Sequence, residues 1–286
     1  MINFLKPTQE QLNSLLECYQ TGRYVDAEKL SVSITKEFPK HPFAWKVLAA
    51  VLKQMGKINE SLVVCQKSVQ LNPQDAEAHN NLGILLQEAQ GRLKEAEESC
   101  RQAITLKPDF VDAHYNLGNT LKKQGRLDEA EESYTQAITL KPDFVDAHYN
   151  LGNTLKEQGR LEEAETNYRK TIALKPDYAE GHNNLGITLQ EQGRLEEAET
   201  NYMKAIALKP DFAEAHRHLT ILKKFHVQDK QYSKMQEIYL DKNISEDQRC
   251  HINFGLAKAC EDLGDLEKAF QHYREGNELR KKLLNY

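Results

Sequence analysis

The stretch "AITLKPDFVDAHYNLGNTLK" occurs twice without a change, at residues 103–122 and again at 137–156. The two copies are offset by 34 residues, and prolines recur every 34 or 35 residues at positions 39, 73, 108, 142, 176 and 210. Glycines at positions 22, 56, 91, 125, 159 and 193 follow the same rhythm. A fixed period of this length is the sequence signature of an architecture built from stacked repeats.

Each repeat carries two helical patterns. Apolar residues recur at helical spacing from His114 to Leu121 and again from Leu127 to Ile138. Gly125 lies between them, where the first helix needs a residue in the left-handed conformation. Pro142 should end the second helix, and Asp143 should cap the next one. The sequence therefore predicts one antiparallel helix hairpin per repeat.

The small residues Gly118 and Ala130 should let the two helices of a hairpin approach closely. Larger Leu, Tyr and Ile side chains would then reach the neighbouring hairpins. One hairpin alone leaves this surface in water, whereas a stack of hairpins buries it.

The spacing "H…NLG…L…G(R)L…EA…Y…A…L.P" resembles the tetratricopeptide repeat over residues 8–212, as six units. His stands where that family commonly has Trp, and Trp45 of this chain occupies that place. The resemblance implies an all-α fold, a right-handed solenoid of antiparallel helix hairpins. We expect residues 1–225 to hold six regular repeats and the start of a divergent seventh, and residues 226–286 to continue the same solenoid.

Within 226–286, Tyr232, Met235 and Tyr239 suggest a looser second helix. Ser245 with Gln248 suits a capping box at the start of a terminal hairpin.

Composition narrows the classes of function. The formal charge of −5 and the pI near 6.1 provide no basic field for phosphate, so nucleic acid is not an expected partner. We find neither a secretory signal nor an apolar run long enough to cross a membrane, and expect a cytoplasmic protein that does not bind membranes. The repeats have a bacterial style, "GRLEEAE…Y…AIALKPD".

Neither the cysteines nor the histidines are spaced for a metal. The five cysteines, Cys18, Cys65, Cys100, Cys250 and Cys260, form no CxxC pair and should be buried thiols. One histidine occurs per repeat, at His79, His114, His148, His182 and His216. Stacked helices lie ~8–10 Å apart, whereas zinc ligands lie ~2.1 Å from one ion. We expect these rings to be scaffold, with a nitrogen bonded locally.

The chain contains no phosphate-binding loop, zinc-protease motif or nucleophile elbow. We therefore expect no cofactor and no catalytic residue, and a chain that is not by itself an enzyme.

The polar face of each first helix is the candidate binding face, since the family uses it to line a groove. The expected peptide-binding residues are Asn81, Tyr115, Asn116, Asn119, Lys122, Tyr149, Asn150, Asn153, Lys156, Asn183 and Asn184. An amide can donate to a peptide carbonyl and accept from its N–H together. The asparagine row, Asn81, Asn116, Asn150 and Asn184, resembles the asparagine ladder in O-linked N-acetylglucosamine transferase. The alternative is that these asparagines are tolerated exposed polar residues.

The asparagine row by itself can provide only a weak affinity for a peptide. Four hydrogen bonds of ~1 kcal/mol each give only about millimolar affinity. Selectivity must come from other residues, and an acidic row predicts ligands with basic groups: Glu77, Asp112, Asp146, Glu180 and Glu214. Tyr, Asn and acids at the groove positions argue against a clamp for a C-terminal carboxylate.

Two further readings stay open. The repeats and the segment "EDQRCHINFGLAKACEDLGDLEKAFQHYREGNELRKK" resemble the region before the catalytic domain in bacterial tetratricopeptide-sulfotransferase proteins. The chain would then recruit substrates for a sulfotransferase or glycosyltransferase-type enzyme, and Leu283, Leu284 and Tyr286 would lie at a domain junction. In the other reading, the protein associates with itself through the groove or an end of its stack.

Overall fold

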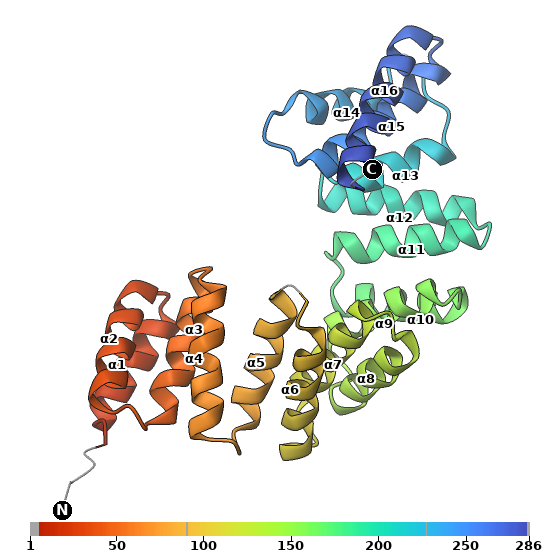
Figure 1. The fold of residues 1–286 in the computed structure, drawn as a ribbon. Helices are drawn as coiled ribbons and strands as arrows, with labels where there is room; N and C mark the ends of the chain where they lie inside the picture. The colour runs from red at the N-terminus through yellow and green to blue at the C-terminus, as the bar shows by residue number, and fades with distance from the viewer. Residues whose placement is uncertain (1–5, 90, 227, 285–286) are drawn as a thin grey trace, which may run out of the picture. The chain divides into compact units, whose positions relative to one another are not determined.

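The computed structural model describes residues 6–89, 91–226 and 228–284. Over these ranges the regular structure is entirely helical, as Figure 1 shows, so the predicted all-α class is confirmed. The first eight helices are α1 (Gln9–Gln20), α2 (Tyr24–Glu37), α3 (Pro42–Gln54), α4 (Ile58–Leu71), α5 (Ala76–Glu88), α6 (Leu93–Leu106), α7 (Val111–Lys123) and α8 (Leu127–Leu140). The others are α9 (Val145–Glu157), α10 (Leu161–Leu174), α11 (Ala179–Glu191), α12 (Leu195–Leu208), α13 (Ala213–Leu222), α14 (Lys230–Leu240), α15 (Glu246–Asp262) and α16 (Leu266–Leu283).

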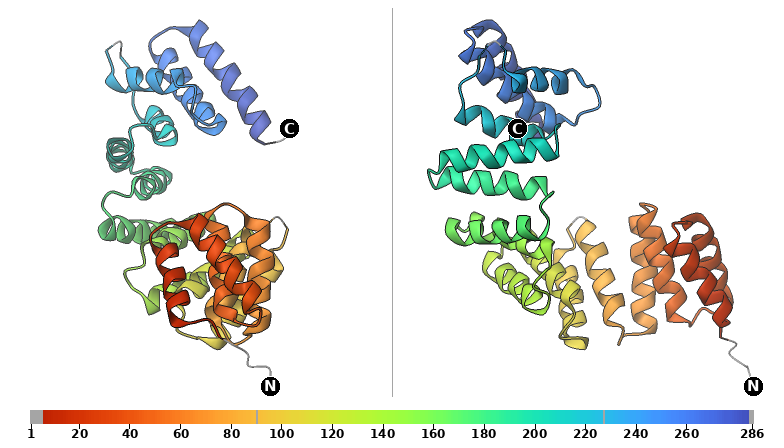
Figure 2. Two further views of the ribbon diagram at one scale, coloured as in Figure 1. Left: turned by 90° about the vertical axis from the view of Figure 1, so that its left-hand side faces the viewer. Right: turned by 180° about the vertical axis from the view of Figure 1, so that it is seen from behind.

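The chain forms two compact units, residues 1–147 and residues 148–286, and the boundary falls inside α9. In the first unit, α3 packs on α4, α5 on α6 and α7 on α8. In the second unit, α11 packs on α12 and α15 on α16. Figure 2 shows these hairpins from two further sides. None of the described helices is long and apolar enough to cross a membrane.

The turn between the two helices of a hairpin has the predicted left-handed glycine. Gly125 has a φ of 76°, and the N–H of Arg126 donates to the carbonyl of Leu121 over 3.0 Å. This bond satisfies a carbonyl that the helix end leaves free. The same positive φ recurs at Gly22, Gly56, Gly91, Gly159, Gly193 and Gly264.

Gly118 determines how closely the two helices of its hairpin approach. A Cβ at this position would lie 2.7 Å from Cε1 of Tyr134, whose ring is fully buried. Gly152 has the same relation to Tyr168, at 2.8 Å. Ala130 is also fully buried, so the predicted close approach through small residues is confirmed.

The prediction that the aspartate after the proline caps the next helix fails at equivalent positions. In α7 the N-cap residue is Phe110, not Asp109, and no side chain bonds the helix end. Tyr178, not Asp177, likewise precedes α11. The reason is register, because the helix begins two residues after this aspartate. Asp75 stands one position later in its repeat, and its carboxylate accepts from the N–H of Ala78.

The C-terminal helices follow the expected order with one correction. The divergent first helix α13 ends at Leu222 instead of residue 225, since Lys223 is extended. Phe225 then turns into the core and is 1% exposed. The capping box of α15 is confirmed, with Gln248 and Ser245 bonding each other's backbone N–H. Met235 of α14 is fully buried, as its helical spacing predicts.

All five cysteines are free and buried, which confirms the prediction of core thiols. Cys100 takes the place that Tyr134 has in the next repeat. Its Sγ atom lies 2.6 Å from where a Cβ on Gly83 would stand, so it occupies the same slot with a smaller side chain.

Ion pairs join consecutive hairpins along the turn edge. The Nη1 atom of Arg126 donates to Glu97 of the preceding hairpin over 2.6 Å, and Arg194 contacts Glu165 in the same way at 2.8 Å. Burial raises the pKa of Glu97, but hydrogen bonds from Arg101 and Arg126 outweigh it and leave this pKa below its usual value. Such a pair therefore connects consecutive hairpins in each unit.

Candidate functional site

The first helices of unit 1 (residues 1–147) lie against one another: α1 contacts α3, α3 contacts α5, and α5 contacts α7. We call the exposed surface of these helices the inner face of unit 1. In unit 2 (residues 148–286), the corresponding surface belongs to α11, α13, α15 and the part of α9 from residue 148 on. The residues expected to bind peptide lie on these first helices.

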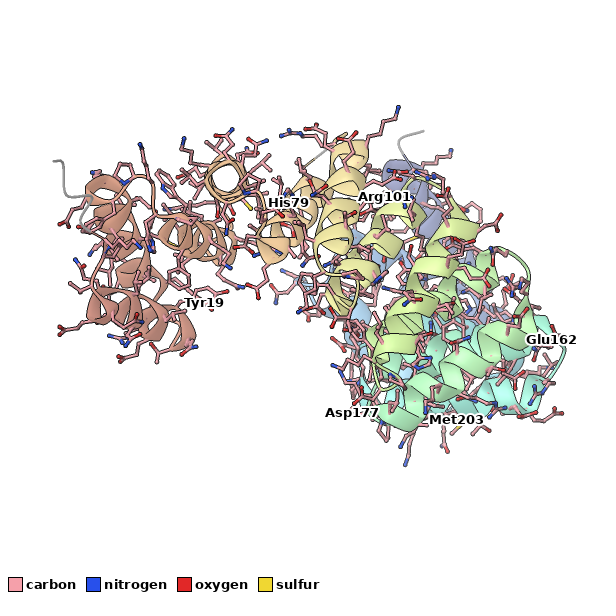
Figure 3. The ribbon with its side chains drawn as sticks, turned by 90° about the horizontal axis from the view of Figure 1, so that it is seen from below. Tyr19, His79, Arg101, Glu162, Asp177 and Met203 are labelled. Atoms are coloured by element: carbon pink, nitrogen blue, oxygen red, sulfur yellow. The ribbon has the colours of Figure 1, made fainter. Side chains whose placement is uncertain are left out.

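A hollow of about 220 Å³ opens on the inner face of unit 1, beside Asn81. Tyr19 of α1, Lys53 and Gln54 of α3, and Asn81 of α5 line it together with small and aliphatic side chains. Tyr19 is labelled in Figure 3. No described residue forms a hydrogen bond with the Asn81 amide, although this side chain is half-buried. The hollow thus combines apolar walls with an unused donor and acceptor.

Two lysines of α3 form ion pairs with later residues. Lys53, which lines the hollow, pairs with Glu88 at 3.2 Å. Lys46 pairs with Asp75 and with Glu77, at 3.0 and 2.9 Å.

A larger hollow of about 1050 Å³ lies at the turn edge, lined by Arg92, Glu95, Glu97 and Arg126. Four of its charged groups are paired within the chain, Arg92 with Glu95 and Arg126 with Glu97. Of these two hollows, the one beside Asn81 lies where the sequence predicts binding.

The other asparagines of unit 1 are engaged within the chain. Asn116 donates from Nδ2 to Oδ1 of Asn80 over 3.0 Å, which joins α7 to α5. The hydroxyl of Tyr134 donates to Oδ1 of Asn119 over 2.8 Å. The Oδ1 atom of Asn116 and its second N–H are not used by any other described residue. Asn116 therefore keeps half of its capacity, whereas Asn119 supports the buried tyrosine.

In unit 2 the equivalent groups form a network. Asn184 donates to Oδ1 of Asn153 at 2.8 Å and to the hydroxyl of Tyr149 at 3.0 Å. Asn153 also accepts from the hydroxyl of Tyr168, at 2.7 Å. Burial raises the pKa of Tyr149, so its phenol stays neutral near neutral pH. The network joins α11 to α9 by hydrogen bonds that also occupy much of the predicted binding row.

Asn183 is almost completely buried, at 1% exposed, and no described residue forms a hydrogen bond with its Oδ1. Its amide N–H groups lie beside Asn184 and Glu214. A side chain this deep cannot reach a ligand without movement of its neighbours.

The remaining predicted site residues are half-buried on their first helices: Tyr115, Lys122, Asn150 and Lys156. The ring of Tyr115 packs against Phe144, with centroids 4.9 Å apart. Three members of the acidic row are paired within the chain, Glu77 with Lys46, Glu180 with Lys209 and Glu214 with His218.

The histidines are scaffold, as expected. The Nε2 atoms of His79, His114 and His216 lie 3.0, 2.9 and 3.0 Å from the carbonyl of the proline six residues earlier. Because a carbonyl only accepts, these nitrogens carry the proton. The indole N–H of Trp45 makes the same bond to Pro39, at 3.0 Å, which explains why Trp and His interchange here.

Among the described residues, no three His, Cys, Asp or Glu side chains are grouped to hold a metal.

Sequence reasoning missed Tyr19, Lys53 and Gln54, which complete the hollow around Asn81. They belong to the first two repeats, and aligning these repeats with the later ones would have placed them on the same helix face. Sequence reasoning also missed Arg217, which occupies the same repeat position as Tyr149 and Asn183, 34 residues after Asn183.

Comparison with protein families identifies the repeat. A model described as "TPR repeat" matches residues 89–125, 118–159 and 152–193. Models described as "Tetratricopeptide repeat" match residues 64–98, 179–212 and 251–283. Together the matches extend over more than half of the chain. A search of curated protein sequences finds no significant match.

Several solved structures share the fold. PilW, described as a widely conserved type IV pilus biogenesis factor, is 21% identical with a TM-score of 0.67, over 76% of this chain and 100% of its own. YrrB, described as a TPR protein with an unusual peptide-binding site, is 23% identical with a TM-score of 0.54, over 65% and 95%. MamA is 23% identical with a TM-score of 0.53, over 58% and 96%. At these identities the likeness concerns the fold alone.

Proposed function

Because the chain belongs to the tetratricopeptide-repeat family, we propose that it is a scaffold that binds an extended protein or peptide segment on the inner faces of its units. The observation that carries this proposal is the hollow beside Asn81, which three successive first helices build. An extended segment crossing α1, α3 and α5 would place one apolar side chain in the hollow, against Ile84 and Ala50. Its backbone would then lie within reach of the Asn81 and Gln54 amides.

The asparagine row takes part unequally in this proposal. Asn81 offers a whole amide, and Asn116 offers its Oδ1 and one N–H. Asn119 and Asn153 already accept hydrogen bonds from tyrosine hydroxyls. Their main role is therefore to support these tyrosines and not to bind the peptide. A segment with both donors and acceptors along its backbone suits the two available amides, irrespective of its side chains.

The structural neighbours support this proposal only in general terms. The YrrB structure is described as having an unusual peptide-binding site, and its fold covers about two thirds of this chain. By the same proposal, residues 1–225 and 226–286 belong to one continuous solenoid in the bacterial cytoplasm.

A phage-displayed library of random peptides tests the function. The wild-type protein should enrich a set of peptides, and Asn81→Ala together with Asn116→Ala should lose that enrichment. The matched control is Gln102→Ala, which removes an exposed amide from the second helix α6. Equal enrichment by the inner-face variant and the control would contradict peptide binding at this face.

Recruitment of substrates for a sulfotransferase or glycosyltransferase-type catalytic domain is a second candidate function. The observation in its favour is an exposed apolar pair on α16, Leu266 and Phe270, at 68% and 67% exposed. Leu283 and Leu284 are 41% and 57% exposed, and Tyr286 lies outside the described residues. Sequencing the reading frame beyond Tyr286 tests this candidate, since a stop codon there would contradict it. Self-association through the same helix stays a prediction, which light scattering over a concentration range can check.

A further inference from the structure

Two arginines of unit 2 lie over one aromatic ring. The guanidinium carbon of Arg217, on α13, is 5.2 Å from the ring centroid of Phe254 on α15. The guanidinium carbon of Arg280, near the end of α16, is 6.0 Å from the same centroid. Three helices thus bring two permanent positive charges to one aromatic residue. We call Arg217, Phe254 and Arg280 the arginine pair site.

The positive charges of this site have no carboxylate partner. Among the described residues, no Asp or Glu lies within ion-pair distance of Arg217 or Arg280, whereas Arg126, Arg169 and Arg194 each pair with two glutamates. Arg217 donates from Nη1 to Nδ1 of His251, a neutral acceptor, over 3.4 Å.

The acidic side chains nearest to the site are already engaged. Glu214 pairs with His218 at 3.5 Å, and Asp247 lies 3.8 Å from Nε2 of His251. Glu246 pairs with Lys282. Among the described residues, these carboxylates contact other side chains and none pairs with either arginine, although Arg217 is half-buried.

We propose that the arginine pair site binds an acidic side chain of a protein segment held on the inner face of unit 2. Arg217 stands in the repeat position of Tyr149 and Asn183, and Phe254 follows it on the next first helix, so the site continues the inner face of unit 2. The inference rests on the proposed function in that its ligand is a protein segment. It adds that this ligand carries Asp or Glu.

The geometry suits a carboxylate. A guanidinium presents a planar fork of donors that matches the two oxygens of Asp or Glu, and stacking on Phe254 holds the fork in place before the ligand arrives. Preorganised donors lose less conformational freedom on binding. Lysine at either position would supply the charge without the fork.

The test uses a fluorescein-labelled oligoglutamate peptide as the probe, with oligoglutamine of the same length as its neutral match. Wild-type protein should bind oligoglutamate more tightly, and the binding should weaken as salt is added. Arg217→Gln and Arg280→Gln should each weaken it about tenfold. Arg217→Lys should fall between wild type and Arg217→Gln.

The matched control is Arg274→Gln, which removes the same charge from an exposed position of the same helix, α16. This variant should bind oligoglutamate like the wild type. Thermal unfolding of each variant identifies a loss that comes from misfolding.

Equal binding of oligoglutamate by the wild type and both arginine variants would overturn the site. So would tighter binding of single-stranded oligodeoxythymidylate than of oligoglutamate, if the arginine variants abolish it. The Asn81→Ala, Asn116→Ala variant separates this inference from the proposed function. If that variant loses library peptides while the arginine variants bind oligoglutamate normally, only the arginine pair site is wrong.

Discussion

The hydroxyl of Tyr134 donates a 2.8 Å hydrogen bond to Oδ1 of Asn119. One of these residues is a fully buried core ring, and the other belongs to the predicted binding row. Tyr168 and Asn153 repeat the relation at 2.7 Å. An asparagine on the inner face can therefore be part of the scaffold, and its presence there does not by itself indicate a binding residue.

Asn119→Ala and Asn81→Ala should differ for this reason. Loss of Asn119 leaves the buried hydroxyl of Tyr134 without its acceptor and should cost about 1–2 kcal/mol of unfolding free energy. Loss of Asn81, whose amide has no partner among the described residues, should change that free energy by less than about 0.5 kcal/mol. Urea unfolding measures both. Equal losses would mean that the two asparagines have one role.

Gly118→Ala should destabilise the protein by about 1–3 kcal/mol, because the added methyl group would overlap the ring of Tyr134. Tyr134→Leu in the same chain should reduce the additional cost of the alanine. A double-mutant cycle measures this coupling. Strictly additive losses would show that Gly118 is required for another reason.

Much of the fold follows from the sequence because the prolines and glycines act locally. The turn at Gly125 depends only on the φ of that residue, and the His114 ring bonds a carbonyl only six residues earlier, that of Pro108. Both features can therefore be predicted from a short stretch of sequence. The predicted capping by the aspartate after the proline is wrong at Asp109. This residue lies one repeat position earlier than Asp75, which does cap its helix.

The candidate site was harder to predict because it depends on contacts between repeats. Asn116 and Asn80 are bonded although they lie in different hairpins, and nothing in either helix alone shows this. Arg217 and Phe254 meet across the divergent segment, where the spacing exceeds the regular period. Periodicity therefore identified the helix face but not which of its side chains are available.

Glu97→Gln should destabilise unit 1 by about 1 kcal/mol, since the 15% exposed carboxylate accepts from Arg101 and Arg126. The loss should shrink in high salt. Its matched control is Glu98→Gln, an exposed neighbour on α6. Chemical unfolding at low and high salt checks both, and an equal effect of the two variants would contradict the role of the inter-hairpin pair.

Acidification should destabilise the protein in part through His216. Burial lowers the pKa of this fully buried ring, and its Nδ1 has no hydrogen-bond partner. The unfolded chain therefore takes up this proton more readily, so stability is lost as the pH falls through the unfolded value of about 6.5. Urea unfolding at about pH 7.5 and about pH 5.5 should show a smaller pH effect for His216→Gln than for wild type. The same pH effect in both proteins would contradict this role.

The central claim is that the inner face holds an extended segment, and photo-crosslinking tests it most directly. A benzoylphenylalanine in place of Tyr19 would replace one aromatic wall of the hollow by another, and one in place of Gln102 would stand on a second helix. With a library-selected peptide bound, mass spectrometry should find crosslinks from position 19 and none from position 102. Crosslinks from position 102 alone, with the peptide still bound, would contradict the account.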